Sequence, residues 1–211
     1  MTRRIHHQAD ADQTPAAVLD FWFRDEATGR MDLPQGQRWF KGGKALDEQL
    51  EQRFAALLAR GRDGQLDDWL QDAQGTLALI VLLDQFNRNI HRGTAEAFAA
   101  DAQALAACLH ALEQAYPAQL PLTQQVFCFL PLEHDESVAS QERSVALFEA
   151  LAAQAPPELQ EFAQGTADFA REHKSIIDRF GRYPYRNAVL GRTSTPAELE
   201  WLAQSNTRFG Q

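Results

Sequence analysis

The segment LALIVLLDQFNRNIHRG, residues 77–93, decides the fold. Its first seven residues, 77–83, include no polar side chain, so a helix formed here is apolar on every face. Such a helix is stable in water only when other elements surround it. We therefore expect a helix over residues 72–90 in the centre of the core, ended by Gly93.

Helical periodicity continues through the rest of the chain, and no stretch shows the alternation of apolar and polar residues that is typical of a half-buried strand. N-cap residues, prolines and glycines predict further helices over residues 14–24, 44–60, 94–114, 121–131, 137–154 and 156–180, and a short one that begins at Thr195. Thr94 is the expected N-cap of the fourth helix. Pro131 is expected to kink or end the fifth, because proline lacks a backbone N–H group. The sequence thus predicts an all-α fold of roughly seven or eight antiparallel helices.

Length, charge and cysteine content narrow the class of protein. A chain of 211 residues, 45% of them hydrophobic, fits one globular domain, which we place at residues 14–211 after a disordered or loosely held tail over residues 1–13. Its 20 Lys and Arg against 29 Asp and Glu give a net charge of −9, which argues against a nucleic-acid partner. No apolar run reaches the roughly 18 residues of a membrane span, so no membrane partner is expected. Without a secretory signal, we predict a cytoplasmic location and expect Cys108 and Cys128 to be reduced, buried thiols.

The first polar cluster follows the apolar helix directly. Asp84, Arg88 and Arg92 are spaced four residues apart, so they share one helix face, and Asn89 lies beside them. An intrahelical ion pair near a helix end explains this pattern. The alternative is a ligand site, because unpaired polar groups on a central helix cost about 1–3 kcal/mol each when buried.

The second polar cluster, Glu133, His134, Asp135 and Glu136, comes directly after Pro131. A histidine among carboxylates suits proton transfer. A charged, solvated turn between two helices explains the same residues.

The third polar cluster begins at His173, which shares the inward face of its helix with isoleucines. Arg179, Arg182 and Arg186 follow, separated by aromatic residues, and Asn187 comes next. Because a guanidinium group stays charged, these arginines need carboxylate, phosphate or carbonyl partners. The segment is therefore expected to be an ordered, docked loop.

Two explanations of that loop stay open. In the structural one, Arg179, Arg182 and Arg186 neutralise Asp84, Glu133 and Glu136, and the loop is a buried latch. In the functional one, part of the positive charge receives a ligand.

We predict a polar, arginine-lined pocket that binds a small anionic metabolite, and the sequence leaves open whether it catalyses proton transfer. The expected acid–base residues are Glu133, His134 and His173. The expected ligand-binding residues are Asp84, Arg88, Asn89, Arg92, Arg179, Arg182, Arg186 and Asn187. No cofactor is predicted. No metal site is predicted either, since the local spacing of a zinc motif is missing, and a metal site formed by Asp84, Glu133, His134 and His173 stays open only as a third possibility.

The alternative function is a non-enzymatic, tetratricopeptide-like scaffold that binds a peptide or partner protein. It should expose the arginines and asparagines along an open concave face, whereas a metabolite site should enclose them. The sequence does not decide the oligomeric state.

Five stretches of the sequence also resemble one family. They are VLDFWF (18–23), WF (39–40), LALIVLLDQFNRNIHRGTAEAF (77–98), FLPLEHDES (129–137) and FAREHKSIIDRFGRYPYRNAVLGRTSTPAE (169–198). Together they are similar to the family known as domain of unknown function 924. The resemblance implies a tetratricopeptide-like, all-helical, single-domain protein, and it implies no particular activity.

Overall fold

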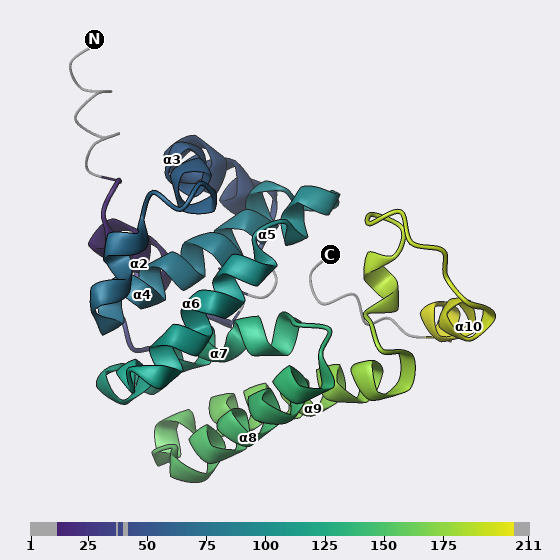
Figure 1. The fold of residues 1–211 in the computed structure, drawn as a ribbon. Helices are drawn as coiled ribbons and strands as arrows, with labels where there is room; N and C mark the ends of the chain where they lie inside the picture. Colours follow the sequence, from purple (N-terminus) through teal and green to yellow (C-terminus); the bar gives the residue numbers. More distant parts are fainter. Residues whose placement is uncertain (1–11, 37, 40–41, 205–211) are drawn as a thin grey trace.

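The computed structural model describes residues 12–36, 38–39 and 42–204, and within these ranges the chain forms helices and no strands (Figure 1). The α-helices are α2 (Pro15–Phe23), α3 (Lys44–Arg62), α4 (Ala73–Ile80), α5 (Asn87–Ile90), α6 (Asp101–Glu113), α7 (Leu122–His134), α8 (Val138–Gln154), α9 (Gln160–Phe180) and α10 (Pro196–Gln204). The predicted all-α class is confirmed. A tetratricopeptide-like pairing of these helices stays a prediction.

The apolar segment forms the centre of the core, as its sequence predicts. Helix α4 leads through a π-helical turn, Val81–Phe86, into α5, so residues 73–90 are helical without interruption. Every residue from Gly75 to Phe86 is buried. Helix α4 packs against α2, α6 and α7, which together cover its apolar faces. The π-helical turn was not predicted.

Aromatic side chains join α2 to this centre. Thr14 accepts a hydrogen bond from the backbone N–H of Ala17 at 3.2 Å, which caps α2 as predicted. The ring of Trp22 then meets Phe86 at 5.5 Å and Phe127 at 5.8 Å between centroids, both edge to face. Such pairs contribute about 0.5–1.5 kcal/mol beyond the area they bury.

One helix prediction is wrong, and one is wrong in its end point. The chain does not form one helix over residues 94–114: a short 3-10 turn, Ala95–Phe98, precedes α6, and Thr94 donates its hydroxyl to the carbonyl of His91 instead of capping a helix. Pro131 does not end α7, which continues to His134. A proline removes only one hydrogen bond, and neighbouring packing sustains the final turn.

Helices α7, α8 and α9 pack side by side, with α8 in contact with both α7 and α9 (Figure 1). The short connections reverse the chain twice, so α7 and α9 run in the same direction. Beyond α9, a segment with little regular structure leads to α10, which begins with the predicted capping box. The carboxylate of Glu198 accepts a hydrogen bond from the backbone N–H of Thr195 at 2.7 Å. In return, the hydroxyl of Thr195 accepts one from the backbone N–H of Glu198 at 3.3 Å.

The predicted tail lies outside the described residues except for its last two positions. Asp12 is buried and accepts two hydrogen bonds from the guanidinium group of Arg53, at 2.6 and 3.0 Å. Both cysteines are buried free thiols. Among the helices described, none combines the length and the apolar character that crossing a bilayer requires.

A pair of glycine substitutions tests the packing of the central helix. A β-carbon at Gly75 would lie 2.3 Å from the backbone oxygen of Trp69, whereas one at Gly165 on α9 would have no atom within 4 Å. We expect Gly75→Ala to reduce the free energy of unfolding by about 1–3 kcal/mol through overpacking. Gly165→Ala should raise it by about 0.5–1 kcal/mol, because alanine favours the helix. Urea denaturation measures both, and equal effects would contradict this account.

Candidate functional site

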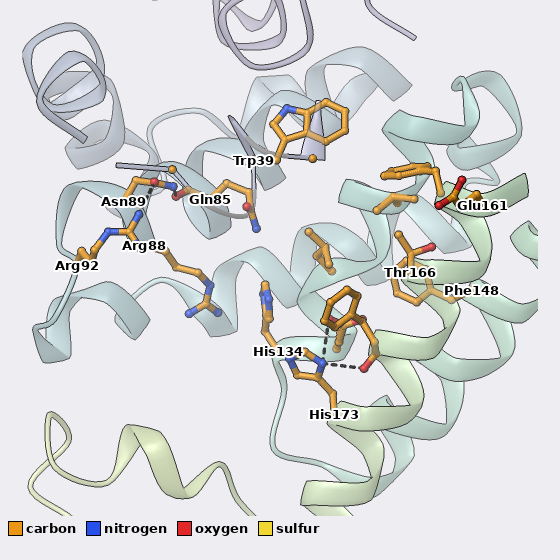
Figure 2. Close-up of a pocket in the computed structure, with 18 of the residues that line it drawn as sticks. Trp39, Gln85, Arg88, Asn89, Arg92, His134, Phe148, Glu161, Thr166 and His173 are labelled. Atoms are coloured by element: carbon orange, nitrogen blue, oxygen red, sulfur yellow. Dashed lines mark hydrogen bonds and ion pairs between the residues drawn. The ribbon is translucent and has the colours of Figure 1, made fainter. Parts of the chain in front are cut away.

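A cavity of about 600 Å³ lies where the central helix, α7, α8 and α9 meet (Figure 2). This volume is typical of small-molecule sites in proteins. One part of its wall is polar and is formed by Gln85, Arg88, Asn89, Arg92, Glu133, His134 and His173. The other part is largely apolar and is formed by Trp39, Val126, Leu130, Phe148, Phe162 and Phe169.

The central feature of the polar wall is a pair between Asp84 and His134. The Nδ1 atom of His134 lies 2.7 Å from Oδ1 of Asp84. Asp84 is 1% exposed, whereas the side chain of His134 is 15% exposed and lines the cavity. The helices therefore bring together two residues that are 50 positions apart in the sequence.

The π-helical turn places Asp84 and Gln85 in this site. A π turn widens the helix by one residue and changes the direction of the side chains that follow, and such turns occur frequently at functional sites. Here both side chains are buried, and the amide of Gln85 donates to Oδ2 of Asp84 at 2.6 Å. The turn therefore fixes the orientation of the carboxylate toward His134.

Asp84 is ionised despite its burial. Burial by itself raises the pKa of this carboxyl group, but the charges of His134 and Arg88 and the hydrogen bonds from His134 and Gln85 outweigh it and hold the pKa well below its ordinary value. Nε of Arg88 lies 3.3 Å from Oδ1 of Asp84. The carboxylate thus has partners on both oxygens.

His134 is neutral at neutral pH. Burial lowers its pKa, Arg88 lowers it further, and the opposing effect of Asp84 does not fully compensate. Because Asp84 is ionised, Nδ1 of His134 carries the proton and donates a hydrogen bond to the carboxylate. The other nitrogen, Nε2, is left with a lone pair and has no hydrogen-bond partner among the residues described. A carboxylate that orients an imidazole in this way prepares Nε2 to act as a base.

Glu133 and His173 form a second pair beside the first. Nδ1 of His173 lies 2.9 Å from the carbonyl oxygen of Phe169 and 3.3 Å from Oε1 of Glu133. Burial and the charges of Asp84 and Glu172 raise the pKa of Glu133 to about 8, and burial lowers the pKa of His173 to about 3. At neutral pH both groups are therefore uncharged, and the contact is not an ion pair. Glu133 is a carboxylic acid that retains its proton.

The end of α7 is held firmly, which fixes Glu133 and His134. The side-chain nitrogen of Gln141 lies 2.7 Å from the carbonyl oxygens of both Glu133 and Asp135. The hydroxyl of Tyr183 also donates to the carbonyl of Glu133. These buried bonds satisfy the terminal carbonyls of the helix, which otherwise lack partners.

The arginines of this region are paired with carboxylates. Nη2 of Arg88 lies 2.9 Å from Asp101, and the same carboxylate is 3.4 Å from Nη1 of the buried Arg186. Arg92 contacts Asp47 at 2.9 Å and donates to the side-chain oxygen of Asn89 at 2.8 Å. Fixed positive and negative charges are therefore nearly balanced along the polar wall.

Three residues expected from the sequence to bind the ligand lie away from this cavity. Arg182 contacts Glu198 at 2.6 Å, and Asn187 donates to Ser194 and Glu198, so both hold the start of α10. Arg179 is exposed and lies over the ring of Phe180. Arg186 does not line the cavity, but it reaches the site through Asp101.

The pairing also differs from the structural latch envisaged from the sequence. Arg192, not one of the three proposed arginines, pairs with Glu136 at 2.6 Å, and Arg88 pairs with Asp84. Glu133 has no arginine partner among the described residues. The segment after α9 is nevertheless docked, since Tyr183 is fully buried.

Several residues of the site had no clear signal in the sequence. Asp101 lies in the middle of the helix expected over residues 94–114, where nothing distinguishes it from a surface acid, and Trp39 appeared only within the motif WF (39–40). Small residues on α9 were the available signal: Gly165 and Thr166, between Phe162 and Phe169, leave space on the inward face. No three His, Cys, Asp or Glu side chains in the described ranges are arranged to hold a metal ion.

The raised pKa of Glu133 predicts a pH dependence of stability. Unfolded Glu133 loses its proton near pH 4.5, whereas the folded protein keeps it until about pH 8. The unfolded state therefore binds fewer protons between these values, and stability falls as pH rises through that window. Relative to Glu133→Gln, the wild type should lose free energy of unfolding by at most about 1.4 kcal/mol per pH unit.

Urea denaturation at pH 5, 6.5 and 8 measures this difference. Glu142→Gln, which removes an exposed carboxylate on α8, is the control. A difference between wild type and Glu133→Gln that grows in favour of the wild type as pH rises would contradict the assignment.

The motifs that suggested a family in the sequence are supported by two comparisons. Residues 18–206 match the family described as a bacterial protein of unknown function, DUF924. The chain is also similar to the solved structure of a protein of unknown function from Agrobacterium tumefaciens, with 32% sequence identity, a TM-score of 0.76, and coverage of 90% of this chain and 97% of that chain. A search of curated proteins finds no match. The chain belongs to the DUF924 family.

Proposed function

We propose that the cavity binds a small anionic molecule and that Nε2 of His134 takes up one proton, from solvent or from the acid form of the ligand, as the anion binds. The observation that supports this proposal is the Asp84–His134 pair, 2.7 Å apart, with Nε2 of His134 directed to a cavity that Arg88 and Arg92 also line. In Figure 2 the ring of His134 lies between the guanidinium group of Arg88 and His173.

Arg88 supplies the first contact for an anion. Its hydrogen bonds to Asp84 and Asp101 use Nε and Nη2, and within the described part of the chain Nη1 has no partner. The side chain is 11% exposed and lines the cavity. An N–H group that faces a cavity from a buried guanidinium is suited to a carboxylate or phosphate oxygen.

The balance of fixed charge explains why proton transfer accompanies binding. Asp84, Asp101 and Asp47 offset the charges of Arg88, Arg92 and Arg186, so an anion entering the cavity meets little net positive charge. His134 is the group that adds one, because protonation of Nε2 creates an imidazolium whose other side is already held by Asp84. A bound anion therefore favours the protonated form of His134.

The chemistry available to a bound substrate follows from the same groups. In the complex with an anion, the imidazolium of His134, stabilised by Asp84, returns its proton from Nε2 to the ligand and thereby becomes a base again. Glu133, with its raised pKa, is a proton donor on the same wall of the cavity. A base and an acid with opposite protonation states at one pH are the requirement for proton transfer within a bound substrate.

The enclosure of Asn89 and Arg88, though not of the exposed Arg92, supports a small ligand over a peptide. Asn89 is 5% exposed, and the side chain of Arg88 is similarly covered. A peptide-binding scaffold would present such groups along an open face.

The cytoplasmic location expected from the sequence is part of the same proposal.

The titration of His134 tests the proposal directly. In protein labelled with ¹⁵N-histidine, we expect Nδ1 of His134 to be protonated and Nε2 unprotonated at pH 7, with the signals assigned by their loss in His134→Gln. Acetate and inorganic phosphate should each raise the pKa of His134 in a saturable way. Affinity for acetate should fall as pH rises, because deprotonation of His134 removes the added charge.

A matched pair of arginine variants supplies the control. Arg92→Gln should weaken acetate binding by roughly threefold to tenfold, because it removes a positive charge from the wall of the cavity. Arg179→Gln makes the same charge change at an exposed residue outside the cavity and should leave affinity unchanged. Equal effects of both variants, or no anion that moves the pKa of His134, would overturn the proposal.

A further inference from the structure

We infer that the ligand is amphipathic, with a single anionic group at the histidine end of the cavity and an apolar chain or ring along its other end. The anionic group rests on the proposed function, whereas the apolar part rests on the separate observations below.

One wall of the cavity is one face of α7. Val126, Leu130 and His134 are spaced four residues apart, so they lie above one another on the same side of the helix. Eight residues of α-helix rise about 12 Å. This face therefore leads from an apolar end at Val126 to the base at His134.

Helix α9 forms the opposite wall with the same polarity. Phe162, Thr166, Phe169 and His173 share its inward side and line the cavity. Because α7 and α9 run in the same direction, the histidines meet at one end, where their ring centroids are 6.5 Å apart. The aromatic residues of α9 then lie toward the end that Val126 and Leu130 occupy. The two helices thus form a channel that is polar at one end and apolar at the other.

The apolar end contains free space and is not simply core. A β-carbon at Gly165 would meet no atom within 4 Å, although this residue lines the cavity between Phe162 and Phe169. Phe169 is 54% exposed, unlike the fully covered rings of the core. Covering such apolar surface with an apolar ligand removes it from water, which lowers the free energy.

The outer rim of the apolar end carries acidic side chains. Glu158 and Glu161 line the cavity near the start of α9 and are exposed. Figure 2 shows Glu161 on the opposite side of the cavity from Arg92 and Asn89. A second negative group at that end of a ligand would be repelled. The channel is therefore suited to a monoanion.

The length of the channel indicates the size of the chain. An extended chain advances about 1.2 Å per bond, so a wall of about 12 Å matches roughly eight to ten carbons. We accordingly choose octanoate as the probe, with acetate, butyrate and hexanoate as shorter acids, octanol as the neutral analogue and suberate as the dianion of equal length.

Calorimetric titration of the full chain at constant pH measures the affinities. Each added methylene should tighten binding by up to roughly fourfold, as for an apolar group removed from water. Octanoate should bind at least tenfold more tightly than octanol and than suberate. Inorganic phosphate and acetate should occupy only the polar end and bind weakly.

A leucine at position 165 tests the location of the chain. Gly165→Leu fills free space in the apolar end without changing any charge, so it should reduce octanoate affinity at least tenfold and leave the effect of acetate on His134 intact. Gln164→Leu introduces the same side chain at the adjacent, exposed position and should have no effect on octanoate. Circular dichroism checks that both variants remain folded.

The outcomes separate this inference from the proposed function. If acetate raises the pKa of His134 but affinity does not increase with chain length, the amphipathic ligand is excluded and anion binding stands. If suberate binds as tightly as octanoate, the single-charge assignment is wrong. If octanol binds as tightly as octanoate, the assignment of an anionic group is wrong, and so is the proposed function. If Gly165→Leu and Gln164→Leu have equal effects, the chain does not occupy this channel.

Discussion

Asp84 carries a negative charge at a position that water does not reach, and the surroundings of the site are arranged around it. Removing one partner from a buried ion pair costs about 3–5 kcal/mol, so such a carboxylate must have its hydrogen bonds supplied by neighbouring residues. Here the partners come from the same helix, through Gln85 and Arg88, and from α7, through His134. The need to stabilise one buried charge thereby orients an imidazole toward the cavity.

A second set of contacts holds the first one in place. Asp101 joins Arg88 to Arg186, which lies over the rings of Phe98 and Tyr183 at 4.7 and 4.5 Å. Tyr183 in turn reaches the last turn of α7, where Gln141 also binds. The segment after α9 therefore supports the site from behind without entering the cavity. Arg182, Arg186 and Arg192 in this segment stabilise the arrangement of the helices, and none of the three lines the cavity.

The sequence predicted more of the fold than of the site. The apolar run at residues 77–83 and the Thr14 cap identify helices from local sequence, and both appear in the structure. Asp84 and Arg88 on one face were likewise predictable from a spacing of four. The sequence could not predict that Arg182 lies apart from Arg88. A charged side chain in a loop gives no information about which carboxylate it will contact. Arg182 meets Glu198, which belongs to the capping box of the following helix.

The amino-acid sequence by itself determined that the chain is helical, where its central helix lies and which segments carry ionisable groups, because helix formation and amphipathic patterning depend on neighbours within a few residues. Only the tertiary structure decided that Asp84 meets His134, that α7 and α9 present their histidines at the same end of one cavity, and that free space remains above Gly165. These features depend on contacts between positions tens of residues apart, and on a π-helical turn that the periodicity of the sequence does not reveal.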